Sequence, residues 1–172
     1  MNIRNITSAD IPALFDVRPR TRENALTVEQ LHDLGITPES VATWLEGSKS
    51  GWLCESATGE VVGFCMADRS TGELLVIALL PTHEGRGFGG RLMQCAEDWL
   101  VHSGCSRAWL TTDLDQTLRA YGFYRHRGWN DWKLERGMRW MQLTLLPAAK
   151  GRPLSSNVRP QISALCQSTS DD

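Results

Sequence analysis

The chain has 172 residues, of which 41% are hydrophobic and 22% are charged. This length and apolar content predict one compact domain with a sizeable core. The formal net charge of −2 gives no electrostatic reason to expect binding to nucleic acid or to an anionic membrane. No apolar run approaches the roughly 18 residues of a membrane span, and the N-terminus lacks a basic-then-apolar leader, so we expect a cytoplasmic protein.

Cysteine and histidine usage indicates neither disulfides nor a metal. The five cysteines are odd in number and include no C-x-x-C pair, so we interpret them as reduced thiols that mostly fill the core. The four histidines show no spacing that is typical of metal ligands. We therefore predict no metal site.

The first part of the chain predicts a short strand and three helices. Residues 2–6 alternate as a strand, and a first helix is expected to begin near Thr7. The Thr27-x-x-Gln30 pattern indicates a capping box for a second helix that ends at Gly35. Thr37-Pro38 begins a third, because proline is favoured at the first helical position.

Three strands are predicted next, at about residues 51–56, 61–68 and 73–80. Thr58-Gly59 and Thr71-Gly72 supply the turns between them, which makes them two consecutive hairpins. The hairpins predict an antiparallel sheet in this part of the chain.

The most informative segment follows the third of these strands. An apolar run ends at Pro81, and glycines at positions 85, 87, 89 and 90 precede a helical pattern that stops at Gly104. Glycine lets the backbone approach a ligand closely, and the free N–H groups at a helix start attract phosphate. We therefore predict a loop that binds pyrophosphate, with Arg86 and Arg91 adding positive charge.

A dinucleotide-binding loop is one interpretation of these glycines. Gly85, Gly87 and Gly90 satisfy G-x-G-x-x-G. That motif begins directly after its strand and has an acidic residue about 20 positions later. Here Pro-Thr-His-Glu intervenes, and Asp113 lies too far along the chain. A nucleotide-binding oxidoreductase is therefore the least favoured interpretation.

The remaining pattern completes a mixed fold. We predict a strand at 107–112, a helix over about 116–127, and strands near 129–134 and 138–145. This order places antiparallel hairpins around a central βαβ unit. It predicts an α+β fold with a mixed, mostly antiparallel sheet flanked by helices.

The composition changes after residue 146. Residues 147–172 contain three prolines, many Ser, Thr and Gln, and few large apolar side chains. Such a segment cannot bury enough surface to offset its ordering entropy. We therefore expect a folded domain over 1–146 and a disordered tail over 147–172.

Two segments resemble the GNAT superfamily of N-acetyltransferases. Residues 84–89, Glu-Gly-Arg-Gly-Phe-Gly, resemble its acetyl-CoA loop, Gln/Arg-x-x-Gly-x-Gly/Ala, with Glu84 in place of Gln or Arg. Residues 119–129 are similar to its Arg-Ala-x-x-Phe-Tyr-x-x-x-Gly-Phe/Trp stretch. The two motifs occur in the family's order and at its separation. The resemblance covers about residues 1–146 and implies the GNAT fold, with acetyl-CoA as co-substrate.

The resemblance also implies where acetyl-CoA binds. In the family, the strand before the glycine loop separates from its parallel neighbour, and its freed backbone pairs with pantetheine. Here that backbone belongs to Ile77, Ala78 and Leu79, with the Leu79 N–H placed to hold the thioester oxygen. The implied pyrophosphate site consists of the amides of Gly85, Arg86, Gly87, Phe88, Gly89 and Gly90. Thr117 takes the place of a family asparagine that contacts the cofactor.

Two residues match catalytic positions of the family. Tyr124 corresponds to the tyrosine that protonates the departing CoA thiolate, and the alternative is a tyrosine packed in the core. Glu73 lies eleven residues before Glu84 and corresponds to the glutamate base of the histone-acetylating branch. The alternative for Glu73 is an exposed turn residue. Glu84 is expected to point to solvent, away from the phosphates.

The acceptor is less well defined. Arg18, Arg20, Arg22 and Glu23 lie between helices and are either a solvated linker or a site for a carboxylate-bearing acceptor. Trp129 or Trp132 is a candidate for the wall of an acceptor cleft.

The leading hypothesis is an acetyl-CoA-dependent N-acetyltransferase. It transfers the acetyl group directly to a primary amine of a small-molecule, peptide or amino-acid-like acceptor. The alternative is a non-catalytic acyl-CoA-binding domain, in which Glu73 and Tyr124 only pack. Either a monomer or a homodimer is compatible with the sequence.

Overall fold

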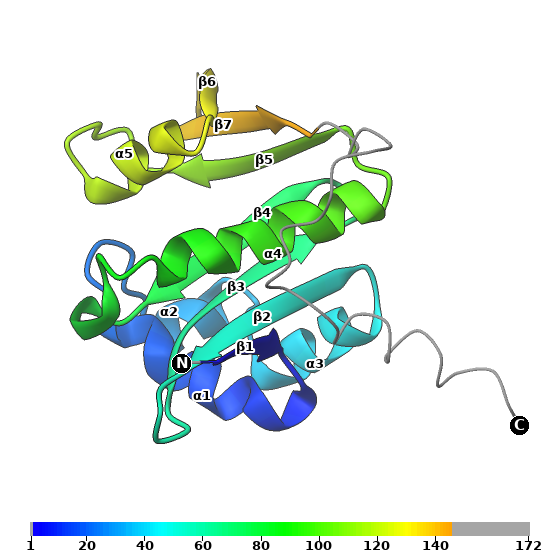
Figure 1. Ribbon diagram of the computed structural model, residues 1–172, viewed down its shortest axis with the longest axis vertical. Helices are drawn as coiled ribbons and strands as arrows, with labels where there is room; N and C mark the ends of the chain where they lie inside the picture. The colour runs from blue at the N-terminus through cyan, green and yellow to red at the C-terminus, as the bar shows by residue number, and fades with distance from the viewer. Residues whose placement is uncertain (1, 146–172) are drawn as a thin grey trace, which may run out of the picture.

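The computed structural model of the protein describes residues 2–145, which form a seven-stranded sheet with helices on both faces (Figure 1). The spatial order of the strands is β1-β2-β3-β4-β5-β7-β6. The strands are β1 Asn2–Asn5, β2 Lys49–Glu55, β3 Val61–Asp68, β4 Glu73–Leu79, β5 Arg107–Thr112, β6 Asn130–Glu135 and β7 Met138–Thr144. All neighbours are antiparallel except β4 and β5, which are parallel. The predicted α+β fold is confirmed.

Five α-helices cover the sheet. They are α1 Ile11–Val17, α2 Val28–Asp33, α3 Pro38–Glu46, α4 Phe88–His102 and α5 Arg119–His126. Helix α4 runs across β2, β3 and β4, while α1 and α3 pack against β3 and β2 from the other side. Successive side chains of β3 point to opposite faces of the sheet. Phe64 and Met66 face the side of α1–α3, and Cys65 faces α4.

The helix starts have the side-chain caps that the sequence predicts. The Gln30 N–H donates to Thr27 Oγ1 at 3.2 Å, and the Thr27 N–H donates to Gln30 Oε1 at 2.9 Å. Thr37 and Ser40 make the same reciprocal pair at the start of α3. Each pair satisfies N–H groups that the first helical turn leaves without partners.

The structure corrects the predicted start of α5. The helix begins at Arg119 and not near residue 116. The Asp115 carboxylate accepts hydrogen bonds from both the N–H and the hydroxyl of Thr117, at 2.8 and 2.7 Å, which holds this segment in a turn. Leu118 then adopts an extended conformation as the N-cap.

Strands β4 and β5 separate over most of their length, and this separation positions the candidate site. Their only paired residues are Glu73 and Trp109. Against β3, Val76 pairs with Met66 and the next pair is Leu74 with Ala67, so Leu75 is an extra residue in β4. A bulge of this kind bends and twists its strand. Beyond Glu73, the edge of β4 that faces β5 therefore has no strand partner (Figure 1).

The predicted disordered tail over 147–172 lies outside the described residues.

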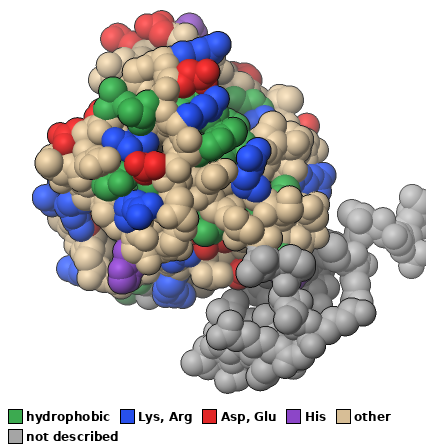
Figure 2. Space-filling model, turned by 90° about the horizontal axis from the view of Figure 1, so that it is seen from above, with side chains coloured by type: hydrophobic (Ala, Val, Ile, Leu, Met, Phe, Trp, Pro, Cys, Tyr) green, Lys and Arg blue, Asp and Glu red, His purple; other side chains and the backbone are tan. Residues whose placement is uncertain are grey.

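The surface and the helices of the domain fit the expectations drawn from composition. Within residues 2–145, none of the helices combines the length and apolar character needed to span a membrane. On the face shown in Figure 2, acidic and basic side chains are interspersed, which fits the small net charge.

Candidate active site

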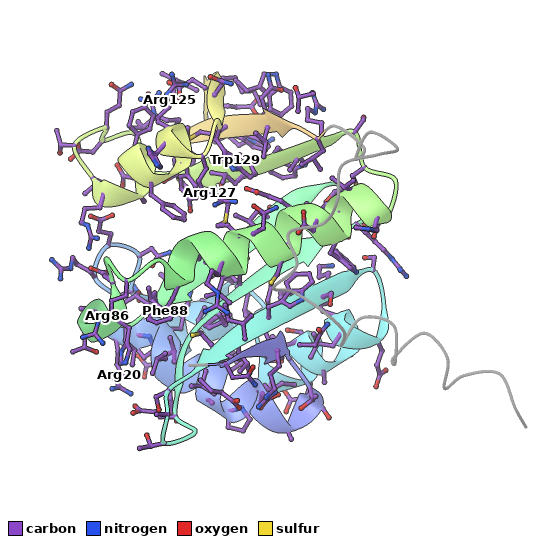
Figure 3. All side chains as sticks on the ribbon, viewed as in Figure 1. Arg20, Arg86, Phe88, Arg125, Arg127 and Trp129 are labelled. Carbon is purple, nitrogen blue, oxygen red and sulfur yellow. The ribbon has the colours of Figure 1, made fainter. Side chains whose placement is uncertain are left out.

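The glycine loop presents a row of free amide groups at the start of α4. Gly87 is the N-cap with φ of +81°, and Gly85 has φ of +73°, a region that side chains other than glycine rarely adopt. Within the described chain, no acceptor pairs with the backbone N–H groups of residues 85–90. Figure 3 shows Arg86 and Phe88 at this end of α4. The unpaired amides and the positive end of the helix dipole suit a phosphate group.

The loop lies beside the free edge of β4 and the end of α5. A Cβ added to Gly89 would lie 3.6 Å from the Phe123 ring and 3.9 Å from Ile77 Cδ1. The glycine loop, β4 and α5 therefore meet at one place. The backbone of Ile77, Ala78 and Leu79 runs past this place on the strand edge that lacks a partner. An extended ligand can pair with such an edge as an added strand does.

Tyr124 lies on α5 with only 8% of its surface exposed. Burial raises the pKa of its phenol well above the usual range, the charge of Glu23 adds to this, and the charge of Arg18 partly offsets it. The phenol is therefore protonated at neutral pH and is a weaker acid than a solvent-exposed tyrosine. Its ring packs at 6.2 Å from Trp129, between centroids.

Glu73 faces a pocket of about 260 Å³ on the opposite side of β4. Residues of α1, α2, α3, β3 and β4 line this pocket, and Glu73 and Arg18 are its two charged lining residues. Burial raises the pKa of the half-buried Glu73 carboxyl, and the negative charge of Asp68 raises it further, while Lys49 acts against both. A carboxylate with a raised pKa is better suited to remove a proton from an amine.

The charge of Asp68 is fixed by its own contacts. Burial alone would raise its pKa, but hydrogen bonds from the Ser70 hydroxyl at 2.6 Å and N–H at 2.8 Å outweigh burial and hold the pKa at about 2. Lys49 Nζ lies 3.2 Å from its other oxygen. Asp68 therefore stays ionised near Glu73 at neutral pH.

Glu84 does not point to solvent, contrary to the sequence-based expectation. Its carboxylate forms ion pairs with Arg22, at 3.3 Å, and with Arg119, and its side chain is 19% exposed. Glu23 accepts hydrogen bonds from the N–H groups of Arg119 and Ala120, at 2.9 and 3.0 Å, and so caps α5. These pairs neutralise Glu84 beside the glycine loop and connect the α1–α2 segment to α5.

The tryptophan candidates for the acceptor cleft do not line the pocket. Trp129 is fully buried, and its Nε1–H donates to Glu97 at 3.1 Å between α5 and α4. Trp132 is 41% exposed on the edge strand β6. Thr117, the remaining predicted cofactor contact, is exposed and already bonded to Asp115. Its role in cofactor binding stays a prediction.

A loop of free amides lies beside a separated pair of parallel strands, and a pocket lies on the other side of β4; this arrangement is suited to a phosphate-containing ligand next to a second ligand. Residues 13–129 match the model of the acetyltransferase (GNAT) family. The chain belongs to this family, which confirms the resemblance seen in its sequence.

Solved structures share the same fold at low sequence identity. PaiA N-acetyltransferase from Thermoplasma acidophilum, in complex with coenzyme A, has a TM-score of 0.71 and 16% identity, over 84% of this chain and 99% of that one. Aminoglycoside 6'-acetyltransferase type Ii has a TM-score of 0.67 and 21% identity, over 87% and 100%. Ribosomal-protein-alanine N-acetyltransferase from Brucella melitensis has a TM-score of 0.65 and 18% identity, over 84% and 100%.

Proposed function

We propose that the protein transfers an acetyl group from acetyl-CoA directly to a primary amine of a small or amino-acid-like acceptor. The observation that supports this most strongly is the arrangement around β4. The free amides of residues 85–90 lie beside the unpaired edge of β4, α5 with Tyr124 approaches the same loop through Phe123, and Glu73 of β4 lines a pocket with α1–α3. This arrangement supports a transfer between two substrates.

The residues present fit acetyl-CoA. The amides of residues 85–90, with the exposed cations Arg86 and Arg91, would hold the pyrophosphate. The free backbone of Ile77–Leu79 would pair with the pantetheine. When bound there, acetyl-CoA supplies an activated thioester.

The side chains of the site account for the proton movements. Glu73 accepts the proton of the acceptor amine, whose protonation at pH 7 opposes reaction by about 4.6 kcal/mol for a lysine-like amine and about 1 kcal/mol for an α-amine. As the C–N bond forms and the C–S bond breaks, the nitrogen releases its second proton to solvent and the Tyr124 hydroxyl donates its proton to sulfur. Tyr124 then regains a proton, and Glu73 loses the one it accepted, by exchange with solvent. The Leu79 N–H donates a hydrogen bond to the carbonyl oxygen, a contribution of about 3–4 kcal/mol in comparable reactions.

Burial does not by itself exclude Tyr124 as the acid. A free phenol near pKa 10 is a weaker acid than a thiol near 8.5, and burial in this site raises the pKa of Tyr124 further. The same burial raises the pKa of thiols, as it does for Cys65. A thiolate formed beside Tyr124 is desolvated as well, so the difference between donor and acceptor is smaller than the tyrosine pKa alone indicates.

The cysteines support direct transfer. Burial raises the pKa of Cys54, Cys65 and Cys95, which keeps these thiols protonated and poorly nucleophilic. They are therefore unsuited to carry the acetyl group as an enzyme thioester. The amine itself is the better nucleophile for this site.

Thiol release from acetyl-CoA across a panel of small amines, amino acids and peptides tests the proposal. We expect release that depends on the acceptor and falls strongly in Glu73→Gln. Tight acetyl-CoA binding without turnover of any amine would favour the non-catalytic acyl-CoA-binding domain. Binding of NAD(H) in preference to CoA would instead favour an oxidoreductase.

A further inference from the structure

We propose that the acceptor is an apolar amino acid, whose carboxylate is bound by Arg18 and whose side chain occupies the pocket beside Glu73. This assignment rests on the proposed acetyl transfer and names the substrate class for it. Three independent features of the pocket support it: the apolar lining, the volume, and the lack of an ion pair at Arg18 within the described residues.

The lining is almost wholly apolar. Ten of the twelve lining residues are hydrophobic, and they include Phe15, Trp44, Phe64 and Met66. Such a surface gains from burying an apolar side chain and offers nothing to hydroxyl groups or additional amines. The acceptor is therefore apolar over most of its surface.

The size of the pocket limits the acceptor to a small molecule. Its volume is about 260 Å³. This is below the roughly 300–1,000 Å³ of sites for drug-sized ligands. An amino acid with a medium-sized side chain matches this volume, and an oligosaccharide does not.

Arg18 forms no ion pair within the described residues. Six Lys and Arg residues within 2–145 are not exposed, and five of them form ion pairs: Arg4, Lys49, Arg127, Lys133 and Arg139. Arg18 is the sixth, and its hydrogen bond within the described chain goes to the carbonyl of Asn24. Its burial is sufficient to lower the guanidinium pKa.

A guanidinium has five donor hydrogens, so Arg18 keeps donors free to bind an anion. A partly desolvated cation that lines a pocket and forms no ion pair within residues 2–145 favours a ligand that brings a negative charge. The pocket therefore offers one carboxylate for the amine of the acceptor, Glu73, and one guanidinium for its carboxylate, Arg18.

The same charges disfavour a polycationic acceptor. An aminoglycoside carries several amines, whereas Glu73 is the pocket's single acidic lining residue and Arg18 repels additional positive charge. This chain therefore shares its fold with an aminoglycoside acetyltransferase but differs from it in the acceptor that the pocket favours.

The test compares L-leucine with L-leucinamide, which lacks the carboxylate charge. We expect Arg18→Met to lower the leucine-to-leucinamide ratio of kcat/KM about 100-fold relative to wild type, because a two-point guanidinium–carboxylate contact is lost. The two amines differ in basicity, so the result is the change in this ratio between variants, from which basicity cancels.

Arg20→Met is the matched control. Arg20 lies two residues along the chain, is 57% exposed and is not part of the pocket lining. Its substitution should leave the ratio at the wild-type value. Arg18→Lys, which keeps the charge without the planar pair of donors, should give an intermediate ratio and serves as the test variant if Arg18→Met does not fold.

Different outcomes separate this inference from the proposed function. An unchanged leucine-to-leucinamide ratio in Arg18→Met would overturn the acceptor assignment. If that variant lost activity equally with both acceptors, Arg18 would act on Tyr124 or on the cofactor, because its charge also influences the pKa of Tyr124. Bound acetyl-CoA with no turnover of any amine would contradict the acetyl transfer itself.

Discussion

Replacing Gly87 by valine is expected to abolish acetyl-CoA binding and to leave a folded protein. Gly87 is the N-cap of α4 with φ of +81°, and a Cβ added there would meet no atom within 4 Å. The substitution therefore introduces backbone strain without a collision inside the protein. The new side chain would stand in the space in front of the free amides.

The two effects have different magnitudes. A side chain other than glycine in the left-handed region destabilises the fold by about 1–2 kcal/mol. Displacing a pyrophosphate from two amide donors removes two hydrogen bonds to a charged group, each contributing about 1.5–3 kcal/mol. The affinity for acetyl-CoA should therefore fall by about 10²–10⁴-fold.

Gly59→Val provides a matched control. Gly59 lies in the turn between β2 and β3 with φ of +82°, and its surroundings are equally open. Both variants should lose similar stability in urea unfolding, but calorimetric titration with acetyl-CoA should show a loss in Gly87→Val alone. Unchanged affinity in a folded Gly87→Val protein, or an equal loss in both variants, would refute the placement of the cofactor loop.

Three further substitutions test the site and its support. Tyr124→Phe removes only the hydroxyl. It should lower kcat by roughly 10²–10³ in steady-state assays, with little change in acetyl-CoA affinity. A loss of kcat under about threefold would mean that water protonates the thiolate. Glu73→Gln should lower kcat and abolish its part of the acidic limb of the pH profile. Burial and Asp68 raise the Glu73 pKa above 4.5, so the ionised base is lost as the pH falls through that raised value, and a limb that persists in the variant would have another origin. Glu97→Ala removes the carboxylate that forms an ion pair with the Arg127 guanidinium. It should lower the free energy of unfolding by about 3 kcal/mol in urea titration. A loss below about 1 kcal/mol would show that solvent replaces the ion pair.

The parts of the fold with local chemical signals were predictable from the sequence. The caps at Thr27 and Thr37 depend on residues within one helical turn. Helix α4 begins at Phe88, so Gly89 and Gly90, which the sequence pattern predicts before the helix, lie in its first turn. The strand at 107–112 has the predicted bounds, because its alternation and flanking turns are local as well. The family motifs added the expected location of the cofactor loop.

Contacts between distant segments were not predictable in this way. The pairing of Glu84 with Arg22 and Arg119 joins residues that no short pattern connects. Arg18 appeared in the sequence as one of several arginines in a connecting segment, and only its burial in the pocket distinguishes it from Arg20. The acceptor side of the site therefore required the three-dimensional arrangement.

The separation of β4 from β5 has a consequence for how the molecule opens. In the sheet, the part formed by β5, β6 and β7 is joined to the rest by the single pair of Glu73 and Trp109. Units with few shared hydrogen bonds often open before the whole protein unfolds. We expect the amides of β5–β7 to exchange with deuterium together, and sooner than those of β2 and β3. A ligand at 100 times its dissociation constant stabilises the state that binds it by about 2.7 kcal/mol. Acetyl-CoA bound between β4 and β5 should therefore slow this exchange about 100-fold. The bound ligand would then hold the two parts of the sheet together in a reversible way.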